Sequence, residues 1–119
     1  MLHKKLAGFG YALAGIRLAW REEANFRFES LFAIATLALG LAFRINPFEW
    51  LVLIIWFALV LSAEAFNTAL EELCDMLRQT HDPHVAKIKD LAAAAVLLVS
   101  VGAFVSGLII FVPYLVALV

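Results

Sequence analysis

Four polar side chains follow a long apolar segment at helical spacing. Residues 50–63 carry one polar side chain, Ser62, and the chain then presents Glu64, Asn67, Glu71 and Asp75. At about 100° per residue, these four positions fall within roughly 80° of one another on one helix face. Ionisable groups are costly next to lipid, so their presence there indicates a functional site. Carboxylates and an amide on one stripe suit the binding of a divalent cation and the transfer of a proton.

The depth of Glu64 separates it from the acids that follow. Residues 50–63 cover roughly 21 Å of helix, which is less than the hydrocarbon core of about 30 Å. We therefore expect Glu64 at or just inside the hydrocarbon boundary, where it would suit a general base. Glu71 and Asp75 lie farther along the chain, and an alternative is that they only solvate the end of the helix.

The composition indicates an all-α membrane protein. The hydrophobic fraction is 65% and the mean hydropathy is +0.95, against about 45–50% apolar residues in soluble proteins. A single membrane domain over residues 1–119 is expected. It should contain a surface helix over about residues 2–24 and spans over about residues 28–45, 49–77 and 85–117. Pro47 suits the first turn of the second span, and Pro113 should kink or fray the end of the third.

The N-terminal segment has a different pattern. Apolar residues recur every three or four positions, at Leu6, Phe9, Leu13, Ile16 and Trp20. This spacing predicts an amphipathic helix in the membrane interface. Packing of the same face on protein is the alternative, and the two can hold together.

The distribution of basic residues predicts the orientation. Eight of the nine lie before the first span or between the second and third, and only Arg44 lies in the other connection. This predicts that the N-terminus lies on the cytoplasmic side of the membrane. No basic patch with interleaved aromatic residues occurs, so nucleic acid is not an expected partner.

Other charged positions could join the stripe. A short turn after the second span should bring Lys89 near the level of Glu71 and Asp75, where it could bind phosphate or form a structural salt bridge. Glu23 or Glu29 could reach the stripe from the first junction and complete an oxygen-rich cation site, or serve interfacial solvation. His81 and His84, with Asp82 between them, could suggest a transition-metal site. That site is disfavoured, since a third ligand at a convincing spacing from the two histidines is missing.

These residues occur in a recognisable order. The segments are Glu64-Ala-Phe-Asn67-Thr-Ala-Leu-Glu71, then Asp75, then Ile88-Lys89-Asp90 followed by small residues. With Glu23-Ala-Asn25-Phe26-Arg27 upstream, the pattern resembles the bacterial integral-membrane diacylglycerol kinase and undecaprenol kinase family over nearly the whole chain. That resemblance implies three transmembrane helices, an N-terminal surface helix and a homotrimer with active sites between neighbouring subunits.

The resemblance also implies roles for individual residues. Glu64 would take the proton of the lipid hydroxyl, and Asn67 would help to place that hydroxyl. Glu23 and Glu71 would hold Mg²⁺ on the phosphates of the co-substrate ATP. The nucleotide would also contact Tyr11, His81, Asp82, Lys89 and Asp90. The γ-phosphoryl group would pass directly to the alcohol.

Some positions depart from the family pattern. The loop reads His81-Asp82, which puts its nucleotide contacts in doubt, and Ile88 replaces an alanine. The sequence does not separate diacylglycerol from undecaprenol as the substrate. A small transporter or channel, or a membrane assembly protein, is the alternative class. It is disfavoured because the acids gather at one end and no polar path continues to the other face.

Overall fold

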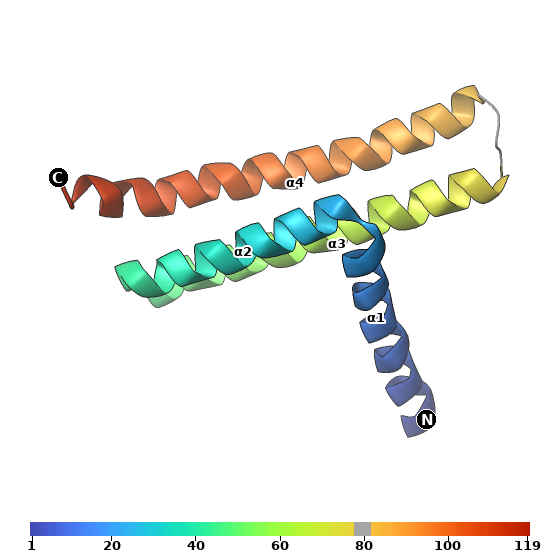
Figure 1. Ribbon diagram of the computed structural model, residues 1–119, viewed down its shortest axis with the longest axis horizontal. Helices are drawn as coiled ribbons and strands as arrows, with labels where there is room; N and C mark the ends of the chain where they lie inside the picture. Colours follow the sequence, from blue (N-terminus) through green and yellow to red (C-terminus); the bar gives the residue numbers. More distant parts are fainter. Residues whose placement is uncertain (78–81) are drawn as a thin grey trace.

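The computed structural model is all-helical and contains four helices in the described part of the chain. These are α1 (Leu2–Glu22), α2 (Ala24–Phe43), α3 (Pro47–Leu77) and α4 (Pro83–Val116). The structure describes residues 1–77 and 82–119. Helices α2, α3 and α4 run side by side, and α1 leaves them at a steep angle (Figure 1). The all-helical fold class is confirmed.

Length and apolar composition make α2, α3 and α4 candidate membrane spans. Large apolar side chains point outward along all three, as with Phe32 at 55% exposed, Ile54 at 57% and Leu98 at 73%. Such a surface would be unfavourable in water and is favourable in a bilayer. Three spans were predicted, and three helices meet the requirement.

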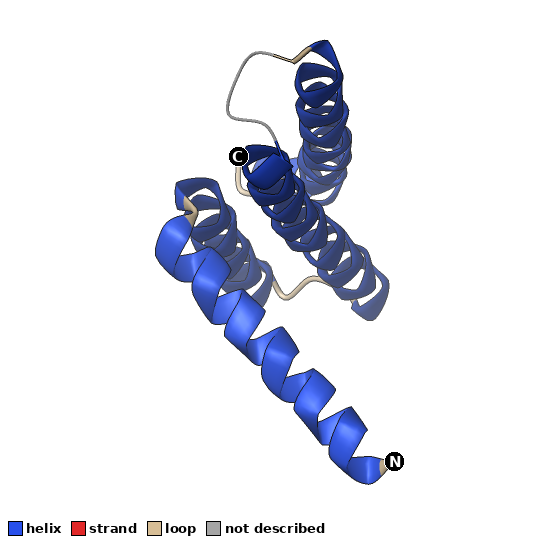
Figure 2. Ribbon diagram, turned by 90° about the vertical axis from the view of Figure 1, so that its right-hand side faces the viewer, coloured by secondary structure: helices blue, strands red, loops and turns tan. Residues whose placement is uncertain are grey.

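The corner between α1 and α2 forms at a single residue. Glu23 has an extended backbone, with φ −110° and ψ 109°. The Arg27 guanidinium donates from Nη1 to the backbone oxygens of Trp20 at 2.8 Å and Arg21 at 2.9 Å. These bonds satisfy carbonyls that the end of α1 leaves without helical donors. Helix α1 therefore ends at Glu22 and projects away from the other helices (Figure 2).

The projection of α1 leaves its apolar side chains uncovered by this chain. Leu6, Phe9, Leu13 and Ile16 are all more than half exposed, and Ala19 is the buried residue of the helix. Within the described part of a single chain, this face of α1 therefore does not pack on the rest of the protein. Its placement in the membrane interface stays a prediction.

The connection between α2 and α3 is short and well capped. Arg44 adopts the left-handed conformation, with φ 53°. The Asn46 side chain accepts from the Glu49 backbone N–H at 2.9 Å, and Glu49 accepts in return from the Asn46 N–H at 3.0 Å. This reciprocal cap fixes the start of α3. Pro47 occupies the first position of α3, as predicted.

Helix α4 returns antiparallel to α3. Asp82 caps its start by accepting from the His84 backbone N–H at 2.8 Å. The helix passes through Pro113 and ends one turn later, at Val116. A Cβ on Gly102 would collide with the indole of Trp56, so glycine is what permits α3 and α4 to approach there.

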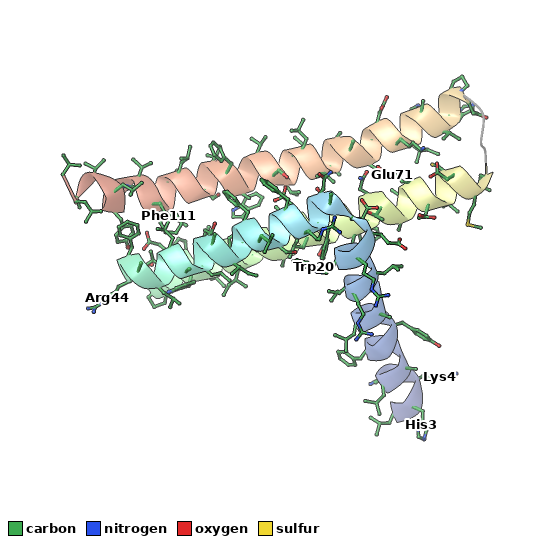
Figure 3. All side chains as sticks on the ribbon, viewed as in Figure 1. His3, Lys4, Trp20, Arg44, Glu71 and Phe111 are labelled. Carbon is green, nitrogen blue, oxygen red and sulfur yellow. The ribbon has the colours of Figure 1, made fainter. Side chains whose placement is uncertain are left out.

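The buried core lies at the end of the bundle opposite Glu64. Ile45, Leu53, Ile110 and Phe111 form it, and the rings of Phe43, Trp50, Phe57 and Tyr114 pack against it. Figure 3 shows Phe111 and Glu71 near opposite ends of the bundle. The core thus holds the three helices together at one end while the polar stripe occupies the other.

Candidate active site

Glu64 is the one charged side chain that is buried in the described residues, with 4% of its surface exposed. It continues a buried stripe of α3 that includes Leu53 and Val60. Because α3 is a single helix of 31 residues, the positions at helical spacing stay on one face past the apolar segment. A carboxylate is therefore held where an apolar residue would ordinarily sit, while its depth in the bilayer stays a prediction.

Three further carboxylates surround Glu64. The charges of Glu29, Glu23 and Glu71, in order of decreasing effect, act on its carboxyl group. All three are half-buried. They come from α2, from the corner between α1 and α2, and from α3. The arrangement gathers like charge that water only partly screens, and a bound cation would relieve the repulsion.

Asn67 has one half of its amide engaged and the other half unpaired. Its Nδ2 donates to Glu71 Oε1 at 3.1 Å. Its Oδ1 is buried and has no hydrogen-bond partner among residues 1–77 and 82–119. An unsatisfied buried acceptor costs about 1–3 kcal/mol, so the oxygen is suited to a donor or cation brought by a ligand.

Lys89 reaches the stripe from α4. Its Nζ lies 2.9 Å from Asp75 Oδ1, and the two side chains are 41% and 65% exposed. The charge of Glu71 also acts on Lys89. The predicted proximity of Lys89 to this level of α3 is confirmed, and it places a positive group beside the carboxylates.

The remaining candidates are not gathered at the stripe within one chain. Tyr11 is 77% exposed on the projecting helix, about 18 Å along its axis from Glu23. Asp90 is exposed, and Asp82 serves as the cap of α4. His81 lies outside the described residues.

Within the described residues, no group of three or more His, Cys, Asp or Glu side chains is arranged to hold a metal ion. Glu71 lies next to Asn67 through its bond from Nδ2, and the charges of Glu23 and Glu71 both act on Glu64. Mg²⁺ is commonly held by one or two carboxylates together with substrate phosphates. The donor set fits that mode of binding.

Arg27 belongs to the segment that carries the family resemblance, but the sequence did not predict its role at the corner. By holding the last carbonyls of α1 it fixes the corner in which Glu23 lies. A basic residue shortly after a helix end is a weak signal for this role. The corner contains no glycine or proline, so the sequence carried no stronger signal that the chain turns there.

Comparison with known proteins decides the family. The family model described as prokaryotic diacylglycerol kinase matches residues 10–111. The chain belongs to the prokaryotic diacylglycerol kinase family. This membership confirms the resemblance noted in the sequence and makes the protein a lipid kinase of the membrane.

Relatives in the prokaryotic diacylglycerol kinase family carry two different names. An undecaprenol kinase of Bacillus subtilis is 33% identical over 114 residues, covering 96% of this chain and 93% of the relative. A diacylglycerol kinase of Synechocystis is also 33% identical over 114 residues, covering 95% of this chain and 65% of the relative. A diacylglycerol kinase of Escherichia coli is 28% identical over 101 residues, covering 85% and 83%. Similarity alone therefore does not identify which lipid alcohol this chain phosphorylates.

Proposed function

We propose that this chain transfers the γ-phosphoryl group of ATP, with Mg²⁺, to the hydroxyl of a membrane lipid alcohol. The alcohol is diacylglycerol, giving phosphatidic acid, or undecaprenol, giving undecaprenyl phosphate. The observation that carries the proposal is the buried Glu64 carboxylate beside the unpaired Asn67 oxygen, near the polar end of a candidate span. Membership of a lipid kinase family supports it.

Glu64 is the base in this proposal. It accepts the proton of the lipid hydroxyl as that oxygen attacks the γ-phosphorus in line. The new P–O bond forms while the bond to the bridging oxygen breaks, and ADP leaves with the electron pair. Asn67 helps to place the hydroxyl beside Glu64. Burial near the hydrocarbon keeps water, a competing acceptor of the phosphoryl group, away from the site.

Glu23 and Glu71 are the proposed Mg²⁺ ligands. Glu71 is already oriented by the Asn67 amide at 3.1 Å, and Glu23 is held at the corner that Arg27 stabilises. The cation would neutralise charge on the phosphates of ATP. The negative charge concentrated around Glu64 favours such an ion.

Lys89 and Asp90 are proposed to flank the nucleotide, with Lys89 on the phosphates. Tyr11, His81 and Asp82 are proposed to complete its site. Because Tyr11 lies far along α1 from the corner, we propose that α1 contributes it to the site of a neighbouring subunit in a homotrimer. The basic residues on the side of the N-terminus support a cytoplasmic location for this site.

The proposal is tested by phosphoryl transfer in detergent micelles. Purified protein is mixed with Mg²⁺, ATP labelled at the γ-phosphate, and either dioleoylglycerol or undecaprenol. Label should enter a chloroform-soluble product, and chelation of Mg²⁺ should abolish this. Absence of transfer to both alcohols, from folded protein in micelles where a reference lipid kinase is active, would overturn the proposal.

A further inference from the structure

An apolar groove runs along the candidate spans on the same side as Glu64. It has a volume of about 350 Å³ and lies between residues 28–39 of α2, 53–61 of α3 and 100–111 of α4. Its polar contributors are Glu29, Thr36 and Ser100. The Thr36 hydroxyl already donates to the Phe32 backbone oxygen at 2.8 Å. Because the walls offer little hydrogen bonding, a charged or strongly polar occupant would be poorly solvated there.

One end of the groove leads to the carboxylates. Val60 lines the groove, and Glu64 follows it one turn later on the same stripe of α3. Glu29 lines the same end, and its charge acts on Glu64. A molecule lying in the groove would thus have its end at the proposed base.

The other end of the groove lies at the buried core. Phe111 lines it and belongs to the buried core with Leu53 and Ile110. Between the two ends, the stretch of α2 that lines the groove spans about 16 Å. The space is therefore long, apolar and limited in depth.

Gly107 marks free volume near the core end of the groove. It lines the groove, and a Cβ built on it meets nothing within 4 Å. A Cβ at this position therefore displaces none of its neighbours, and we expect a longer side chain there to extend into the groove. It would also favour the helix, since glycine is a poor helix former.

We infer that this groove holds one hydrocarbon chain of the lipid alcohol, with the hydroxyl end at Glu64, and that Gly107 sets how far the chain can enter. The inference rests on the proposed function and adds a determinant of chain length to it. The continuity of the groove with the carboxylate site favours the lipid substrate over a helix of a second copy as the occupant.

The test compares Gly107→Leu with Gly8→Leu and the wild type. Gly8 also has open space around it and lies on α1, outside the groove. Phosphoryl transfer is measured for dibutyrylglycerol and dipalmitoylglycerol, or for a short and a long prenol. Gly107→Leu should keep the short-chain rate and lose about tenfold or more in kcat/KM for the long chain. Gly8→Leu should match the wild type, and an unchanged chain-length profile in Gly107→Leu would overturn the inference.

Photo-crosslinking tests the occupant without catalysis. A long-chain diacylglycerol or prenol with a diazirine near its chain end should label residues 100–111, and Gly107→Leu should reduce that labelling. Labelling confined to other surfaces, or crosslinks from the groove to a second copy, would overturn the inference even if transfer occurs. Absence of transfer to every alcohol by the wild type would instead overturn the proposed function, while the labelling result still decides what fills the groove.

Discussion

Lys89 of α4 forms an ion pair with Asp75 of α3 across 2.9 Å. The pair joins the two helices near the polar end of the bundle, next to Glu71. Both side chains are partly exposed, so the pair can open at little cost when a stronger partner arrives. In the proposed reaction, phosphate oxygens of ATP are that partner, and Asp75 holds Lys89 in place until then.

Replacement of Lys89 should weaken nucleotide binding. Lys89→Met removes the only charge we assign to the phosphates from α4, so KM for MgATP should rise by about tenfold or more. Lys87→Met, an exposed position on the same helix, should leave KM unchanged. Steady-state kinetics at saturating lipid measures both. An unchanged KM in Lys89→Met would reduce the residue to a structural salt bridge.

Loss of the Glu71 charge should weaken Mg²⁺ binding. Glu71→Gln removes one carboxylate of the proposed pair, and affinity for hard cations depends on ligand charge. The Mg²⁺ concentration for half-maximal activity should rise by about tenfold. The neighbouring exposed residue provides the control, Glu72→Gln. Identical Mg²⁺ titrations of the two variants would contradict the assignment.

Arg27 should act through the position of Glu23. Arg27→Ala leaves the backbone oxygens of Trp20 and Arg21 without their donor. Hydrogen exchange should then increase at the corner, and the Mg²⁺ requirement should rise together with it. Arg27→Lys should recover part of both, because an ammonium can satisfy one carbonyl. Faster exchange with an unchanged Mg²⁺ titration would limit Arg27 to a structural role.

Tyr114 should matter for stability and not for catalysis. Its hydroxyl donates to Glu49 Oε1 at 2.5 Å and ties the end of α4 to the cap of α3. Glu49 lies about 22 Å along α3 from Glu64. Tyr114→Phe should therefore lower the Tm by several degrees and leave kcat unchanged. A matching fall in kcat at a temperature well below the Tm would show that the two ends of the bundle are coupled.

The sequence predicted those features that depend on spacing within one helix. Glu64, Asn67 and Glu71 share a face because α3 is continuous, and their polarity after an apolar segment was visible directly. Lys89 could be placed near them because the turn before α4 is short. The start of α3 followed from Asn46 and Pro47, whose local chemistry favours a turn and a first helical residue.

Other features depend on how separate helices meet, and the sequence could not predict them. The groove forms only where α2, α3 and α4 converge, so no local pattern encodes it. The bond between Tyr114 and Glu49 joins residues 65 positions apart. The corner at Glu23 contains neither glycine nor proline and arises from the two bonds that Arg27 donates.

The central claim is that Glu64 accepts the proton of the lipid hydroxyl. Glu64→Gln keeps the shape of the side chain and removes the base, with Glu72→Gln as the matched change on the same helix. The measurement is kcat for transfer from labelled ATP to the preferred lipid alcohol, on protein shown to be folded. The account predicts a fall of about 10²–10⁴-fold for Glu64→Gln alone. Comparable kcat values for Glu64→Gln and the wild type would contradict it.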